Sequence, residues 1–264
     1  MGRSSFPEMY ERYLVEPLFR PWAEIILQRL ELAAGDRLLD VACGTGIVAR
    51  LASQRLGAAR VVGVDVNPQM LAVASALAPD IDWREGSAGA LPIDDREKFD
   101  VAVCQQGLQF FPDKPAAARE MRRVLASGGR LAIATWRPLD EIPLLQELHR
   151  VVERHVGAVV DRRHGFGDAA ALGALLAGAG FQDVRVETLS RTMSVDDAAV
   201  FVRMNAMAIV GMSTASAAMD DARRAEVVAS IAGDSSHVLR PYAAGQGLAF
   251  ELSTNVAMAR ADAP

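Results

Sequence analysis

The sequence predicts an α/β fold in which a mostly parallel sheet carries helices on both faces. Apolar runs of strand length alternate with segments of helical spacing over residues 38–136. The run 99–104 is almost continuously apolar, which is typical of a strand buried on both faces. A small-residue turn, 42–46, follows the first run and opens a helix. Alternation of this kind implies parallel strands joined by right-handed crossovers.

Seven strands are expected, the last of them antiparallel, with helices between them. The strands are expected at 38–41, 60–65, 81–85, 99–104, 130–136, 184–189 and 248–259. The helices are expected at 21–30, 47–55, 68–78, 115–125, 144–156 and 168–178. Asp168 suits the N-cap of the last of these helices. Within 7–19, Pro17 is expected to end or kink any helix.

Composition excludes several classes of protein. A net charge of −5 gives no broad attraction for a nucleic-acid backbone or an anionic lipid surface. The apolar run 198–219 contains an arginine and an asparagine, so it does not resemble a membrane span. Cys43 and Cys104 each end an expected strand and are interpreted as small buried residues. Residues 1–7 lack the layout of a signal peptide, so we expect a cytoplasmic protein.

The residues at the carboxyl ends of the expected strands predict a nucleotide-type site, because ligands of open α/β sheets bind there. Gly44 and Gly46 allow backbone N–H groups to approach a ligand near the start of helix 47–55. Asp65 follows Gly46 by 19 residues, which suits a carboxylate that accepts hydrogen bonds from ribose hydroxyls. These features serve nicotinamide and S-adenosylmethionine cofactors equally.

Asp40 favours one of the two cofactors. An acid inside the turn is awkward beside a diphosphate, but it suits a ligand that carries a sulfonium and an ammonium. The sequence therefore favours S-adenosylmethionine.

With these residues in place, the chain resembles the class I S-adenosylmethionine-dependent methyltransferases, in the small-molecule subgroup similar to quinone-biosynthesis enzymes. The matching motifs occur in unbroken order at 40–46, 64–71, 85–92, 99–113 and 120–130. The resemblance implies a Rossmann-like seven-stranded mixed sheet and S-adenosylhomocysteine as product. Ala42, Ser87 and Ser127 depart from the family pattern, where glycine, aspartate and proline are frequent.

The resemblance also implies the cofactor contacts. The turn would surround the methionine part, Asp65 would hold the ribose, and the backbone carbonyl of Gln105 would accept from the ammonium. The residues expected at the cofactor are Asp40, Ala42, Gly44, Thr45, Gly46, Asp65, Val66, Met70, Ser87, Ala88 and Gln105.

The sulfonium is already an activated methyl donor, so alignment and a dry site are expected to matter more than acid–base chemistry. Many relatives have a histidine after strand four where this chain has Gln109, and an amide cannot take a proton. We predict no general base from this loop and leave the catalytic residues unknown. The substrate candidates, for which helix or core packing is the alternative role, are Tyr10, Tyr13, Arg20, Gln109, Phe110, Met204 and Met207.

Other polar residues are given ordinary roles. The four histidines, 149, 155, 164 and 237, lack metal-ligand spacing and are interpreted as surface or helix-packing residues, so no metal is expected. The pairs 122–123 and 162–163 are interpreted as solvated arginines.

The whole chain is expected to form one domain. Its expected parts are an N-terminal lid (1–20), a cofactor-binding core (21–136), an extra helix with the sixth strand (137–194), a helical substrate insertion (195–246), and the last strand with a tail (247–264). The expected partner is a small-molecule substrate, with no nucleic acid and no membrane, and a homodimer is left open. An NAD(P)-dependent oxidoreductase and a non-catalytic cofactor-binding regulator remain as alternatives.

Overall fold

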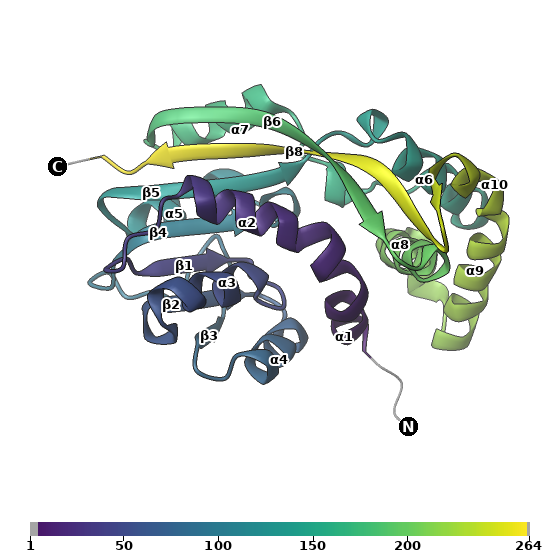
Figure 1. Ribbon diagram of the computed structural model, residues 1–264, viewed down its shortest axis with the longest axis horizontal. Helices are drawn as coiled ribbons and strands as arrows, with labels where there is room; N and C mark the ends of the chain where they lie inside the picture. The colour runs from purple at the N-terminus through teal and green to yellow at the C-terminus, as the bar shows by residue number, and fades with distance from the viewer. Residues whose placement is uncertain (1–4, 263–264) are drawn as a thin grey trace.

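The computed structural model describes residues 5–262, so the ends of the expected lid and tail lie outside the described residues. Seven principal strands form one mixed sheet in the order β3-β2-β1-β4-β5-β8-β6 (Figure 1). These strands are β1 (Leu38–Val41), β2 (Val61–Asp65), β3 (Asp82–Glu85), β4 (Phe99–Gln105), β5 (Leu125–Trp136), β6 (Gln182–Val195) and β8 (Gly247–Arg260). β8 runs antiparallel to both β5 and β6, and the five strands from β3 to β5 are parallel. The predicted mixed sheet is confirmed.

An eighth strand, β7 (Ala243–Ala244), pairs with β8 and was not predicted. It contains only two alanines, so no β-branched or aromatic residue marks it as a strand. β5 and β6 are also longer than expected, because β5 passes through an irregularity near Gly128, which has φ +73°, and β6 continues to Val195.

Helices cover both faces of the sheet (Figure 1). On one face α2 (Arg20–Arg29) and α3 (Ile47–Leu56) share an apolar core with Val101 and Val103 of β4. On the other face α5 (Lys114–Val124) and α7 (Ala169–Gly178) share a core with Ala102 and Cys104 of the same strand. β4 therefore buries alternate residues on both sides, which explains its nearly continuous apolar sequence.

The N-terminal segment stays helical through Pro17, where an end or a kink is expected, and it changes from α- to π-helix around that residue. It consists of α1 (Phe6–Tyr10), a π-helical segment η1 (Glu11–Phe19) and α2. In an α-helix the ring of Pro17 would meet the carbonyl of the preceding turn. The wider π turn moves that carbonyl away, and the Arg20 N–H donates to the carbonyl of Val15, five residues earlier.

The predicted helical insertion forms a cap beside the sheet (Figure 1). Its helices α8 (Ala198–Met212), α9 (Asp221–Asp234) and α10 (Ser236–Leu239) pack with α6 (Pro143–Val156) around an apolar core that also includes Trp22 of α2 and Trp136 of β5. β8 pairs with β5 only over residues 254–260, so 190–195 and 248–253 pair with each other beyond the sheet. This two-stranded ribbon, 190–195 with 248–253, connects the cap to the sheet.

One further helix, α4 (Pro68–Leu77), belongs to the sheet half. It packs on β2 and β3 and lies next to α1. Asp168 caps α7 as predicted, because its side chain accepts from the backbone N–H groups of Ala170 and Ala171.

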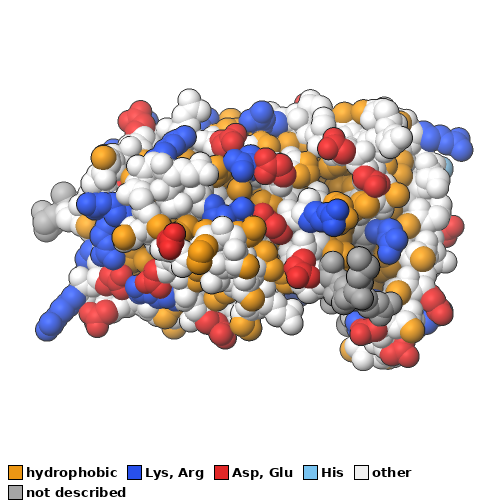
Figure 2. Space-filling model, turned by 60° about the horizontal axis from the view of Figure 1, so that its bottom comes forward, with side chains coloured by type: hydrophobic (Ala, Val, Ile, Leu, Met, Phe, Trp, Pro, Cys, Tyr) orange, Lys and Arg blue, Asp and Glu red, His pale blue; other side chains and the backbone are white. Residues whose placement is uncertain are grey.

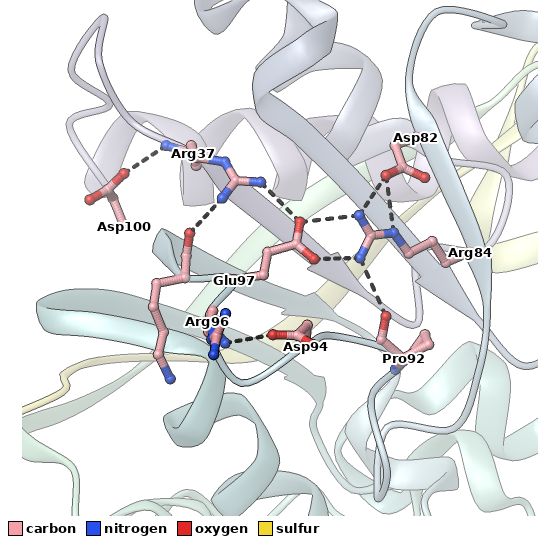
Figure 3. Close-up of polar contacts among 9 residues, drawn as sticks. Arg37, Asp82, Arg84, Pro92, Asp94, Arg96, Glu97 and Asp100 are labelled. Carbon is pink, nitrogen blue, oxygen red and sulfur yellow. Dashed lines mark hydrogen bonds and ion pairs between the residues drawn. The ribbon is translucent and has the colours of Figure 1, made fainter.

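An ion-pair network fixes the loop that precedes β4 (Figure 3). Glu97 accepts from Arg84 (2.7 Å) and from Arg37 (2.9 Å), and Arg84 also donates to Asp82 (2.6 Å). The Arg37 backbone N–H donates to Asp100 (2.8 Å). The network joins β3 to the starts of β1 and β4, away from the strand ends that carry the predicted site.

On the face shown in Figure 2, positive and negative side chains are interspersed rather than gathered by sign. Across residues 5–262, no helix combines the length and the apolar character needed to cross a membrane.

Candidate functional site

A cavity of about 940 Å³ lies beyond the carboxyl ends of β1, β2 and β4, between the sheet and the cap. Residues that end these strands form one side of it, and residues of α8 and β8 form the other. Small-molecule sites usually measure about 300–1,000 Å³, so this cavity has room for more than one small ligand.

The turn after β1 has three residues with positive φ, at Ala42 (+57°), Gly44 (+56°) and Gly46 (+85°). Gly44 has no neighbour within 4 Å of the place where a Cβ would lie, so its backbone is open to a ligand. A Cβ on Gly46 would lie 2.3 Å from the Trp83 ring. Glycine is therefore required at 46 by both backbone conformation and packing.

The Asp40 side chain lies against the first turn of α3 and binds a backbone N–H group there. Its carboxylate is buried and accepts from the backbone N–H of Ala49 (3.0 Å). Burial, together with the charge of Asp65, raises the pKa of Asp40 to about 8. In dinucleotide-binding folds the free N–H groups of such a helix start receive a diphosphate. Here the protein's own acid takes that place, so the geometry disfavours a dinucleotide.

Asp65 is held at the end of β2 by two backbone N–H groups. Gly44 donates to one carboxylate oxygen and Asn67 to the other, each at 2.8 Å. Burial raises the pKa of Asp65, while the hydrogen bonds from Asn67, Gly44 and Val66 oppose that shift. A carboxylate has about four lone-pair positions, so two remain for the hydroxyls of a ligand.

Three glutamines, at the end of β4 and in the turn after it, line the cavity, and each has a side-chain oxygen without a partner. The side-chain N–H groups of Gln105, Gln106 and Gln109 donate to Phe19 O (2.9 Å), Thr254 Oγ1 (3.0 Å) and Gln106 O (2.8 Å). All three Oε1 atoms are buried, and no described residue donates to them. An unpaired buried acceptor costs about 1–3 kcal/mol. The acidic turn, with Asp40 and Asp65 in the cavity wall, fits a ligand that carries an ammonium.

Most of the residues predicted at the cofactor come together at this cavity. Those that line it are Asp40, Ala42, Gly44, Asp65, Val66, Met70, Ser87, Ala88 and Gln105. Thr45 and Gly46 do not line it, because Thr45 is buried beneath the turn and Gly46 faces Trp83.

The predicted substrate residues divide in the same way. Those that line the cavity are Tyr10, Gln109, Phe110, Met204 and Met207. Tyr13 and Arg20 lie elsewhere: Arg12 lies over the Tyr13 ring (5.1 Å), and Arg20 pairs with Glu16 (2.7 Å).

Tyr10 packs against Phe19 at the cavity wall, with 5.1 Å between ring centroids. Burial raises the pKa of its hydroxyl, and the charges of Glu11, Asp65 and Asp40 add to the shift. The hydroxyl therefore stays neutral and cannot act as a base at neutral pH.

The cap side of the cavity is largely apolar, with residues from β5, α6, α8 and β8. They are Trp136, Leu145, Phe201, Met204, Met207, Met212, Phe250 and Leu252. A predominantly apolar lining suits an organic acceptor of low polarity. Met219 packs against the cap core instead of lining the cavity.

Two sequence interpretations are wrong at the short turn η5 (Arg162–His164), between α6 and α7. Arg163 is not a solvated surface charge, because it pairs with the buried Asp161 (2.6 Å) and lines the cavity. His164 is not a surface histidine, because it is 8% exposed and lines the same cavity. Asn205 of α8, also missed, receives a hydrogen bond from Arg163 (3.0 Å).

Arg122 and Arg123 are not simply solvated either. Arg122 pairs with Asp262 (2.6 Å) and Arg123 with Asp95 of the loop before β4 (2.9 Å), and each arginine side chain is about one-third exposed. Both arginines therefore tie elements of the sheet half together.

Cys43 and Cys104 are free and buried, as predicted. In the described part of the chain, His, Cys, Asp and Glu side chains form no group of three or more that could hold a metal ion.

Comparison with protein families places a methyltransferase domain at residues 39–133. Residues of this chain are 37% identical to a 2-phytyl-1,4-naphtoquinone methyltransferase of Synechococcus elongatus, over 51% of this chain and 60% of that protein. They are 34% identical to a ubiquinone/menaquinone biosynthesis C-methyltransferase of Xylella fastidiosa, over 51% of this chain and 58% of that protein. The matches thus span about 60% of these curated relatives.

Solved structures share the fold at lower identity. The YcgJ protein of Bacillus subtilis is 20% identical with a TM-score of 0.58, over 92% of this chain and 98% of that one. Phosphoethanolamine N-methyltransferase 2 of Haemonchus contortus, in complex with S-adenosyl-L-methionine, is 18% identical with a TM-score of 0.56, over 99% of this chain and 61% of that one. Residues 39–133 thus carry a methyltransferase domain, about half of the chain is similar to methyltransferases of quinone biosynthesis, and the chain shares its fold with solved methyltransferase structures.

Proposed function

We propose that this chain transfers the methyl group of S-adenosylmethionine to an oxygen, nitrogen or carbon nucleophile of a small, largely apolar organic acceptor. The observation that carries the proposal is the shared cavity, in which the acidic turn of β1 faces the apolar wall of the cap. A donor held at the turn would present its methyl group toward an acceptor held at the cap.

Named residues would hold the donor. Asp65 would accept from the ribose hydroxyls, Gly44 would let the backbone approach the methionine part, and Asp40 with Gln105 would surround the ammonium with acceptors. When bound, the sulfonium supplies an activated methyl group, so the residues of this chain need mainly to align the acceptor and exclude water.

The curated relatives, a 2-phytyl-1,4-naphtoquinone methyltransferase and a ubiquinone/menaquinone biosynthesis C-methyltransferase, support a ring-shaped acceptor. The buried, free cysteines suit a reducing compartment, and we place the reaction in the cytoplasm. A homodimer stays a prediction.

Calorimetric titration with S-adenosylhomocysteine, compared with NAD, tests the donor site. We expect binding of the first and none of the second, and the reverse would overturn the proposal. Transfer of a tritiated methyl group to 2-naphthol, 1,4-dihydroxynaphthalene or quinoline tests turnover. Cofactor binding without label in any acceptor would favour a non-catalytic regulator.

A further inference from the structure

His164 lies at the acceptor side of the cavity although it comes from the connection between α6 and α7. η5, which contains it, packs directly against η3 (Leu108–Phe110), the turn that follows β4. Gln109 of η3 lines the same cavity. The imidazole is thus brought next to the loop where many relatives carry a histidine and this chain carries an amide.

One ring nitrogen of His164 forms a hydrogen bond to the backbone, and the other has no hydrogen-bond partner among the described residues. Nδ1 lies 2.9 Å from the backbone carbonyl of Arg137, which can only accept, so Nδ1 carries the proton. In the neutral ring Nε2 then has a lone pair, and no described residue donates to it. His164 is 8% exposed and lines the cavity.

The charged and titratable groups around the ring keep it neutral. Burial lowers the pKa of His164 below its usual 6.5, and the positive charge of Arg163 on the same turn lowers it further. The carbonyl of Arg137 at the end of β5 and the carboxylate of Asp161 oppose this shift, while His149 of α6 adds to it. The ring is therefore an unprotonated acceptor at neutral pH.

Two donors line the same cavity as this acceptor. Asp161 binds the Arg163 guanidinium through Nε (2.8 Å) and Nη2 (2.6 Å), and Nη1 donates to Asn205 (3.0 Å). These contacts use one N–H of each Nη group and leave the second free. The Asn205 carboxamide also keeps its NH2, since no described residue accepts from it. A fixed cation and an amide donor stabilise negative charge that develops on an oxygen.

We propose that His164 is the general base of this enzyme, and that His164, Arg163 and Asn205 form a subsite for the hydroxyl of a phenolic or hydroquinone-type acceptor. The inference rests on the proposed methyltransferase function and names its acceptor class. It is compatible with the expectation that the loop after β4 supplies no base, because the base comes from another element.

The proton transfer balances simply. The acceptor O–H bond breaks, its proton moves to Nε2, and the electron pair stays on the oxygen next to Arg163 and Asn205. That oxygen forms the new bond to the methyl carbon while the C–S bond electrons remain on sulfur, giving S-adenosylhomocysteine. The imidazolium then returns its proton to solvent.

The decisive variant is His164→Asn. The Asn side-chain NH2 takes the place of Nδ1–H and can keep the bond to the Arg137 carbonyl, while the base is lost. We expect kcat with 2-naphthol to fall about 10²- to 10⁴-fold, with unchanged affinity for S-adenosylhomocysteine and an unchanged urea midpoint. His155→Asn is the matched control, because His155 pairs with Asp234 (2.9 Å) outside the cavity, and we expect wild-type activity from it.

Kinetic and NMR measurements distinguish a general base at position 164 from a residue with only a structural role. Wild-type kcat/KM is expected to stay flat above pH 6.5 and to fall in acid, whereas that of the variant should rise with ionisation of the acceptor. The defect should shrink with 1-nitro-2-naphthol, which ionises without help. Without S-adenosylmethionine, 2-naphthol should shift the imidazole ¹⁵N resonance of Nε2 and not that of Nδ1.

The outcomes are distinct from those of the proposed function. If wild-type protein neither binds S-adenosylhomocysteine nor methylates any acceptor, the proposed function fails. If wild-type protein methylates 2-naphthol and His164→Asn matches it at every pH, the function stands and the role of His164 is refuted. An equal loss with both naphthols, with no ¹⁵N shift, would also refute it and leave His164 a structural residue.

Discussion

The packing of Trp83 against the cofactor turn yields a quantitative prediction for Gly46→Ala. The new Cβ would lie 2.3 Å from Trp83 Cη2 and 2.9 Å from Cζ3, at a residue with φ +85°. The left-handed conformation costs about 1–2 kcal/mol for a residue with a Cβ. Overpacking against the partly buried Trp83 ring adds about 1–3 kcal/mol. We therefore expect a loss of about 2–5 kcal/mol in the free energy of unfolding.

Gly245→Ala is the matched control. Gly245 has φ +63° and nothing within 4 Å of its Cβ position, so only the conformational cost of about 1–2 kcal/mol applies. Both variants are measured by urea unfolding, and calorimetry follows S-adenosylhomocysteine affinity, which should drop only in Gly46→Ala. Equal unfolding free energies for the two variants would show that the Trp83 side chain moves aside without cost, and the packing argument would fail. Trp83→Leu should recover part of the loss in the double variant.

Three further predictions concern charged groups. Since the pKa of Asp40 is about 8, the group is mostly protonated at pH 7, and binding of an ammonium-bearing ligand should expel up to about one proton. Calorimetric titrations in phosphate and in Tris, which differ in ionisation enthalpy, test this release. Equal binding heats in the two buffers would contradict it. Asp65→Asn should weaken S-adenosylhomocysteine binding at least ten-fold, because a charge-assisted hydrogen bond contributes about 1.5–3 kcal/mol; unchanged affinity by calorimetry would remove Asp65 from the site. Glu97→Gln should destabilise the protein by about 1–2 kcal/mol at pH 7. The folded-state pKa of Glu97 is lowered by Arg84 and Arg37, so its contribution is present above the ordinary value of 4.5 and is lost as the pH falls further. The unfolding free energies of variant and wild type should converge in acid, and a constant difference would contradict the network.

The parts of the fold that depend on local pattern could be predicted from the sequence. β4 is apolar at nearly every position because it is buried on two faces, and its strand assignment follows from that alone. The turn after β1 is recognisable because glycines at 44 and 46 meet a local backbone requirement. Asp65 could be placed in the cavity because parallel strands end at the same edge.

Residues that reach the cavity through tertiary packing could not be predicted. Arg163 and His164 lie in an irregular connection with no hydrophobic period, and only the packing of η5 on η3 gives them a role. The unbroken helix through Pro17 escaped prediction for a related reason. A π turn is set by neighbouring contacts, and the sequence around a proline points toward a break.

The ribbon formed by 190–195 and 248–253 separates the sheet half, which carries the donor site, from the cap, which forms the acceptor side of the cavity. Its residues pair with each other and not with β5, so the strand pairing that holds the acidic turn ends where the cap begins. The apolar core of the cap also includes Trp22 of α2 and Trp136 of β5, but it is distinct from the two cores on the faces of the sheet. Acceptor choice can therefore be altered by exchanging the segment carried on the ribbon, with the donor pocket left intact. The sheet half thus provides a constant donor site, and the cap provides a part that can be replaced.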